Sequence, residues 1–97
     1  MLFIIEAIDK KDSLKIRLNT RPKHLEYLKT LGNDVVLAGP FLDGNEKPNG
    51  SLIIVKSSSL EVAKEMAKND PYNEAGLFES VKVRAWLWAV NKPENIE

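Results

Sequence analysis

Residues 34–57 read DVVLAGPFLDGNEKPNGSLIIVKS, and this stretch decides the fold class. Its two ends, 34–42 and 51–57, are rich in aliphatic and β-branched residues, which is typical of strands. The eight residues between them, DGNEKPNG, contain Asp-Gly, Lys-Pro and Asn-Gly dipeptides, which mark turns. The stretch therefore predicts two antiparallel strands joined by a long hairpin loop.

The segment before this hairpin predicts a helix that begins late. Residues 21–31 place leucines along one stripe and end before a Gly-Asn pair, which is common after a helix C-terminus. Pro22 has no amide hydrogen and disfavours helical angles in the residue before it. We therefore expect only a short turn at 13–18, and then a helix proper that begins at Arg21 or Pro22 and is capped by Thr20.

The segment after the hairpin predicts a second helix over about 59–69. Ser58 and Glu61 fit a capping box at its start, and Pro71 follows its end. Small and apolar residues recur at helical spacing and form one narrow stripe, so a single face of this helix should be buried. The residues of this stripe are Val62, Ala63, Met66 and Ala67.

A strand is predicted near each end of the chain. Residues 2–9, LFIIEAID, are apolar on both sides, so we expect this strand to be central and covered on both faces. Residues 79–90 predict a long last strand that carries two tryptophans, and 91–97 predict a polar, frayed tail.

The resulting order, β-α-β-β-α-β, is the ferredoxin-like pattern of an α+β fold, here as one domain over residues 1–97. Two right-handed crossovers lay both helices on one face of a four-stranded antiparallel sheet, with the first and third strands in the middle. No element remains to cover the second face, although it is apolar too, and such a face usually marks an interface. A homodimer formed by sheet-to-sheet packing is the simplest solution, and the alternative is a C-terminal tail that folds back over the sheet.

The amino-acid composition excludes several classes of binding partner and catalytic site. The 97-residue chain has 14 basic and 14 acidic side chains, so it lacks the basic surface that binds nucleic acid or an anionic membrane. The absence of cysteine, together with a single histidine, excludes thiol catalysis, zinc-thiolate and iron–sulfur sites and multi-histidine metal motifs. No apolar stretch approaches the roughly 20 residues that cross a bilayer, and no export signal is visible, so we expect a cytoplasmic protein without a metal.

Histidine is the side chain that titrates near neutrality, and the one histidine is His24. Arg21 lies three residues before it on the same helical face, and Arg17 would join this face if the helix continued through Pro22. Such a face suits a helix whose first turns line a pocket. The alternative is a surface histidine on a solvated face.

Asp70 is a candidate partner of His24. It stands directly before Pro71 and Tyr72, so its plain interpretation is a carboxylate at a helix stop. In the functional interpretation, the carboxylate holds the imidazole, fixes its tautomer and raises its basicity, which makes a general base. Sequence spacing alone does not show whether the two side chains meet.

Two further positions are candidates for binding a small molecule. Gly39 and Pro40 end the second predicted strand, where a glycine lets a ligand approach the backbone closely, although a simple turn explains them equally well. Tyr72 is a candidate binding residue beside Asp70, although tyrosines more often serve as amphipathic packing residues.

The chain resembles the YciI family (the YCII-related domain) over nearly its whole length. The features that carry the resemblance are, in chain order, Asp12-Ser13-Leu14, Arg17-Leu18, Arg21-Pro22-x-His24-Leu25, Ala38-Gly39-Pro40, Ser59-Leu60-Glu61, Asp70-Pro71-Tyr72 and Ala75-Gly76-Leu77-Phe78. The resemblance implies a ferredoxin-like fold that dimerises as a dimeric α/β barrel, and a cleft whose histidine and aspartate match His24 and Asp70. Some relatives are dehydrochlorinases that act on chlorinated hydroxyquinols, with this pair as the proton-transfer unit.

Three functions are therefore compared. The first is a cofactor-independent lyase or isomerase, with His24 as general base, Asp70 orienting it, and Arg21 with Arg17 stabilising an enolate or phenolate oxygen of a small molecule. The second is a ligand-binding or sensor module without catalysis that uses the same cleft, with the same substrate-binding candidates, including Tyr72. The third is a dimerisation or accessory domain.

Overall fold

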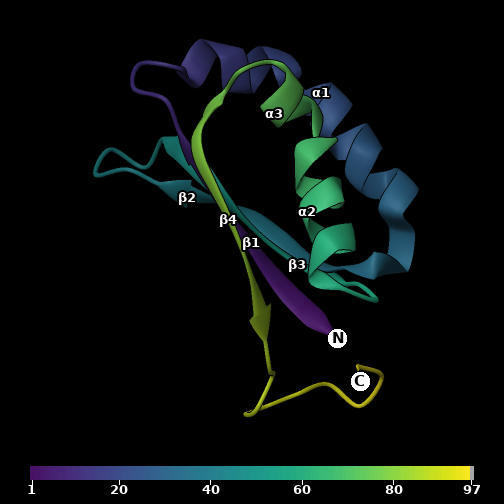
Figure 1. The fold of residues 1–97 in the computed structure, drawn as a ribbon. Helices are drawn as coiled ribbons and strands as arrows, with labels where there is room; N and C mark the ends of the chain where they lie inside the picture. The colour runs from purple at the N-terminus through teal and green to yellow at the C-terminus, as the bar shows by residue number, and fades with distance from the viewer. Residues whose placement is uncertain (97) are drawn as a thin grey trace.

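Within residues 1–96, which the computed structural model describes, a four-stranded antiparallel sheet forms one layer and α-helices form the other (Figure 1). The elements are β1 (Leu2–Asp9), α1 (Leu14–Leu31), the 3-10 turn η1 (Gly32–Asp34), β2 (Val35–Leu42), β3 (Pro48–Lys56), α2 (Leu60–Lys68), α3 (Pro71–Glu74) and β4 (Phe78–Trp86). The strands lie in the order β2-β3-β1-β4, so β1 and β3 are central, as the ferredoxin-like pattern requires. The predicted α+β class is confirmed.

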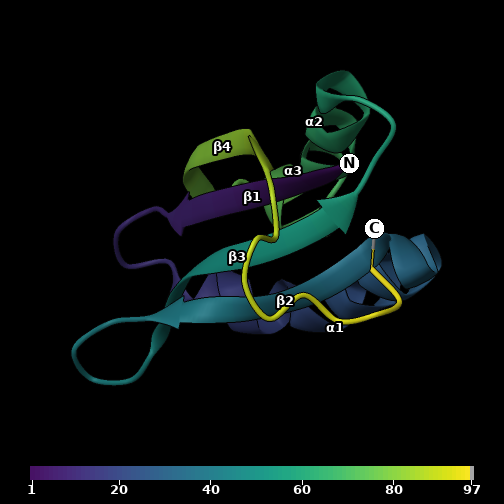
Figure 2. The same ribbon diagram turned by 90° about the horizontal axis from the view of Figure 1, so that it is seen from below.

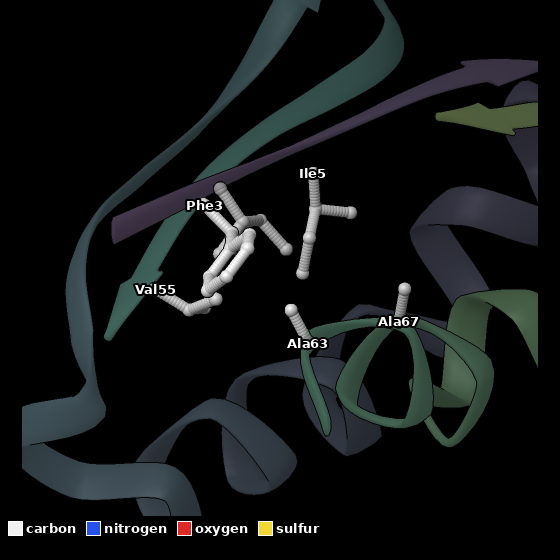
Figure 3. Packing of buried hydrophobic residues seen from close by; sticks show 6 residues of the cluster. Phe3, Ile5, Val55, Ala63 and Ala67 are labelled. Carbon is white, nitrogen blue, oxygen red and sulfur yellow. The ribbon is translucent and has the colours of Figure 1, made fainter. Parts of the chain in front are cut away.

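The core lies between the sheet and α2. Phe3 and Ile5 of β1 stand directly opposite Val55 and Ile53 of β3, and the four side chains are at most 4% exposed. The alanines Ala63 and Ala67 of α2 point toward Phe3 and Ile5 (Figure 3), and their small size lets the helix approach the sheet closely. Each large apolar side chain buried in this way stabilises the fold by about 1.5–3 kcal/mol.

The helix α2 begins one residue later than the capping prediction. Ser59, rather than Ser58, is its N-cap, and the Ser59 hydroxyl accepts a hydrogen bond from the Val62 amide at 3.2 Å. The Ser57 hydroxyl donates to the Ser59 carbonyl oxygen at 2.8 Å, which holds the turn that leads into the helix. The helix therefore starts where a side chain satisfies one of its unpaired amides.

The second face of the sheet, which we call the open face, carries no helix of the described chain (Figures 1 and 2). The strand alternation assigns to it Leu2, Ile4, Glu6, Ile8, Leu52, Ile54, Lys82, Arg84 and Trp86. The chain after β4 passes in front of the strands on this side (Figure 2), but its Leu87 and Val90 are 79% and 72% exposed. Because Ile8 is still 42% exposed, this segment leaves part of the apolar face uncovered.

The helix α1 is continuous from Leu14 to Leu31, so the prediction of a short turn followed by a helix that starts at Arg21 or Pro22 is wrong. Pro22 lies inside it and deprives the Leu18 carbonyl of its usual partner. Leu18 and Pro22 are both exposed, so water can solvate that carbonyl. Buried side chains on both sides of the proline attach the helix to the rest of the fold, and these contacts offset the cost.

The last strand ends at Trp86 and not at residue 90. Trp86 pairs with Leu2, the first residue of β1, so residues 87–90 have no neighbouring strand within residues 1–96 to pair with. Their strand-like sequence is therefore not sufficient to extend β4. None of the helices within residues 1–96 has both the length and the apolar character that a bilayer crossing needs.

Candidate active site

The structure brings His24 and Asp70 together, although 46 positions separate them in the sequence. The Nδ1 atom of His24 lies 2.9 Å from Oδ1 and 3.0 Å from Oδ2 of Asp70, and both residues are buried. Because a carboxylate only accepts hydrogen bonds, Nδ1 carries the proton and donates it. The other ring nitrogen, Nε2, is then the basic atom of the neutral imidazole.

Asp70 is held in place by the turn on which it lies. It is the N-cap of the short helix α3, and its Oδ1 accepts a hydrogen bond of 2.9 Å from the Tyr72 amide. Pro71 occupies the first turn of α3, where its missing amide hydrogen has no cost. Asp70 therefore both caps a helix and holds the imidazole of His24, so the two interpretations offered by the sequence do not exclude each other.

The ring of Tyr72 contacts both His24 and Arg17. It stacks on the imidazole with the centroids 4.0 Å apart and the planes inclined by 18°, and the Arg17 Cζ lies over it at 4.5 Å. Burial raises the pKa of the Tyr72 phenol, although the positive charges of Arg17 and Arg21 oppose this. The phenol therefore stays protonated at neutral pH, so it does not act as a base.

Arg17 is 4% exposed and is paired with Asp9 at the end of β1. Its Nε donates to one carboxylate oxygen at 2.7 Å and its Nη2 donates to the other at 2.9 Å, which is a bidentate pair. Burial would lower the pKa of Arg17, but the hydrogen bond and charge of Asp9 outweigh it and the net direction is upward. Nη2 also donates to Ser51 Oγ at 2.9 Å.

Sequence reasoning missed Asp9 and Ser51. The sequence does hold a signal for Asp9, because every second residue of β1 faces the helix-covered side of the sheet. This side receives Phe3, Ile5, Ala7 and then Asp9. An acid on that side needs a buried cation. Ser51 gives no such signal, since serines are common at the start of a strand.

These side chains line a cavity of about 210 Å³ between α1 and the sheet. Its polar lining comes from Arg17, Arg21, His24, Ser51 and Tyr72, and its apolar lining includes Leu18, Leu25, Leu28, Pro40 and Ile53. All the sequence-predicted site residues except Asp70 line it, and Asp70 contacts it through His24.

The other predicted candidates lie on β2 and α1. Gly39 lines the cavity, but a Cβ added there would meet nothing within 4 Å, so the position does not require glycine for space. Arg21 forms no ion pair with any of residues 1–96, whereas Arg17 is balanced by Asp9. The cavity therefore has one uncompensated positive charge, which favours an anionic ligand. Within the same residues, no three His, Asp or Glu side chains gather as a metal site.

Comparison with known proteins identifies the family. The sequence profile of the YCII-related domain matches residues 1–87. The chain belongs to the YCII family. Protein YciI of Escherichia coli O6:H1 (strain CFT073) is 41% identical to it over 92 residues, which cover 87% of this chain and 94% of that protein.

Solved structures add a relative with a named activity. This YCII-family chain is similar to the 5-chloro-2-hydroxyhydroquinone dehydrochlorinase TftG of Burkholderia phenoliruptrix AC1100, solved in complex with 2,5-dihydroxybenzoquinone. The TM-score is 0.84 and the identity 32%, over 90% of this chain and 94% of that one. An antibiotic biosynthesis monooxygenase shares the fold alone, with a TM-score of 0.53 and 12% identity over 90% of this chain and 99% of that one.

Proposed function

We propose that this YCII-family protein is a cofactor-independent lyase or isomerase of the dehydrochlorinase type, which transfers a proton on a small organic molecule. One observation carries the proposal: the 2.9 Å contact between His24 Nδ1 and Asp70 leaves Nε2 as a base on a residue that lines a cavity. No buried polar side-chain atom of residues 1–96 lacks a hydrogen-bond partner. Nε2 has no such partner there, so it is reachable from the cavity.

In the proposed reaction, Nε2 of His24 accepts a proton from an acidic O–H or C–H of the substrate. For a ring that carries both chlorine and hydroxyl groups, a proton taken from one O–H is first delivered to the carbon that bears chlorine, which gives the keto tautomer. Loss of a second O–H proton then forms a new π bond as chloride leaves with its bonding pair, so the net loss is HCl. No oxidant or reductant is consumed. Asp70 stabilises the imidazolium that forms, and Arg21 stabilises the negative charge that develops on a substrate oxygen.

The size of the cavity supports a substrate with a single ring. A cavity of about 150 Å³ in another protein binds benzene, and the cavity here measures about 210 Å³. There is room for one six-membered ring with a few substituents. The dehydrochlorinase relative, whose named substrate and bound ligand each contain one such ring, supports the same class.

The test is chloride release from 5-chloro-2-hydroxyhydroquinone. We expect His24→Ala and Asp70→Asn to lower kcat by about 10²–10⁴-fold, which is the usual contribution of a general base. The exposed Asp34 is the matched control, and Asp34→Asn should leave kcat unchanged. Binding of 2,5-dihydroxybenzoquinone is measured in parallel, and a wild-type protein that binds it but releases no chloride would contradict the proposal in favour of a binding module.

We also propose that the protein is a homodimer whose two copies meet through their open faces. The support is Ile8, which stays 42% exposed, beside the half-buried Ile4, whereas Leu2 and Ile54 of the same face are already buried within the chain. Glu6 pairs in register with Lys82, so this face also carries both signs of charge. A two-fold axis lets such a self-complementary patch meet its own copy.

A further inference from the structure

The side chain of Ser51 lies at the junction of the cavity and the buried Arg17–Asp9 pair. Ser51 is 4% exposed, it lines the cavity, and its Oγ accepts the 2.9 Å hydrogen bond from Arg17 Nη2. A guanidinium has only donors, so Ser51 must be the acceptor in this contact. The hydroxyl proton of Ser51 is then left for another acceptor, and no group within residues 1–96 takes it.

Arg17 is fixed, so the hydroxyl that it contacts is fixed as well. The guanidinium is clamped by both oxygens of Asp9 and lies against the ring of Tyr72. Its charge is balanced by Asp9, and one of its donors is engaged by Ser51. Arg17 is therefore poorly suited to bind a substrate anion itself and well suited to orient a neighbour.

Arg21 follows Arg17 by four residues, which places it on the same face of α1 one helical turn later. It lines the cavity and has no ion-pair partner among residues 1–96. The cavity thus offers two donors, the Ser51 hydroxyl and the Arg21 guanidinium, and one basic acceptor, Nε2 of His24. A ligand that satisfies all three needs an oxygen that carries negative charge and a separate acidic proton.

We propose that Ser51 and Arg21 together bind an anionic oxygen of the substrate, and that Arg17 is a positioning residue that acts through Ser51. The substrate class is a small oxyanion, such as a phenolate, an enolate or a vinylogous acid, on one ring. This inference names the substrate class for the proposed function, and it rests on that function only because both use the same cavity. Ser51 then selects for the charged oxygen, and His24 acts on the proton.

The experiment compares two probes by isothermal titration calorimetry at pH 7. The first probe is 2,5-dihydroxybenzoquinone, which is ionised at that pH, and the second is phenol, a single ring that is not. We expect Ser51→Ala to weaken binding of the first probe by about 10-fold or more, the usual effect of losing a hydrogen bond to a charged group. Phenol should lose less than about 3-fold, because its oxygen carries no charge.

Three variants serve as controls. Ser51→Thr keeps the hydroxyl and should restore binding of the dihydroxybenzoquinone, whereas Arg21→Met should weaken it by about 10-fold or more. Ser80→Ala removes a hydroxyl from β4, outside the cavity, and should leave both affinities unchanged. Arg17→Lys keeps the positive charge but loses the guanidinium, which alone can contact Asp9 and Ser51 together. This change alone should weaken binding, but it should add little when combined with Ser51→Ala, because both changes remove the same oriented donor.

The proposal is overturned if Ser51→Ala leaves binding of the dihydroxybenzoquinone unchanged, if both probes weaken equally, or if the wild type binds neither. Equal weakening would mean that Ser51 only supports the fold. Because these are binding measurements, they are independent of turnover. A protein that shows the Ser51 dependence but releases no chloride disproves the proposed function alone, and chloride release unaffected by Ser51→Ala disproves the inference alone.

Discussion

At the scale of single residues, the cavity wall depends on the buried Arg17–Asp9 pair. Both side chains are 4% exposed and share two hydrogen bonds. Removing one partner of such a pair leaves the other charge buried without compensation, which is far costlier than losing an exposed salt bridge. The pair therefore matters for stability mainly because breaking it would leave one buried charge without its partner.

Replacing Asp9 tests this directly. We expect Asp9→Asn to lower the free energy of unfolding by about 3–5 kcal/mol, because the Arg17 guanidinium keeps its charge and loses its counter-ion. The measurement is urea denaturation followed by circular dichroism. Asp34→Asn, at an exposed position, should change the same quantity by no more than about 0.5 kcal/mol. An equally small change for Asp9→Asn would show that solvent reaches Arg17.

The raised pKa of the Tyr72 phenol makes stability depend on alkaline pH. Burial is its main cause, so the folded state holds the phenolic proton more tightly than the unfolded state does. The contribution is complete below the ordinary pKa of 10.0 and is lost as pH rises through the higher folded value. We expect the free energy of unfolding to fall above about pH 10, and to fall less steeply in Tyr72→Phe. Identical slopes in the two proteins, measured by urea titration at several pH values, would contradict this.

At the scale of elements, α1 shows how distant contacts override a local signal. The sequence predicts that Pro22 starts the helix, yet the helix runs through it. The compensating contacts join Arg17 to Asp9 and His24 to Asp70, and the second of these spans 46 positions. A local pattern carries no information about partners that far away, so the continuity of α1 could not be predicted.

Replacing the proline should stabilise the helix. We expect Pro22→Ala to raise the free energy of unfolding by about 1–3 kcal/mol, since the interior amide regains its partner while the unfolded chain gains some freedom. Chemical denaturation measures the change, and Lys23→Ala, at the next exposed position, should give a much smaller one. A loss of stability in Pro22→Ala would indicate that the proline shapes the helix so that Arg17 and His24 both reach their partners.

The order of the strands and the presence of the hairpin were predictable because their signals are local, although β3 begins at Pro48 and not at residue 51, since Pro48 and Gly50 pair with β2. The period-2 alternation of residues 2–9 and the turn residues of 43–50 both act within a few positions. The length of β4 was not predictable in this way, since it depends on where its partner β1 begins. In the cavity, His24 is singled out as the one histidine and Asp70 is a candidate partner that the motif resemblance supports, whereas Ser51 requires the register of β3 against β1.

At the scale of the whole molecule, the open face leads to a prediction about assembly. We expect size-exclusion chromatography with light scattering to give about twice the chain mass of 10.9 kDa. Ile8→Lys places a charge on the open face and should shift the mass toward one chain. Ile16→Lys, on the exposed side of α1 at a similar exposure of 39%, is the matched control and should leave the dimer intact. A wild-type mass of one chain would contradict the proposed dimer.

The two long helices are attached to the sheet by different forces. The helix α2 is held by apolar packing against Phe3 and Ile5, whereas the buried residues of α1 are Arg17 and His24. Regions with few buried apolar contacts open at a lower free energy than the hydrophobic core. The helix that carries the candidate base is thus attached to the sheet less firmly than α2 is, and a ligand that contacts both α1 and the sheet would strengthen this attachment.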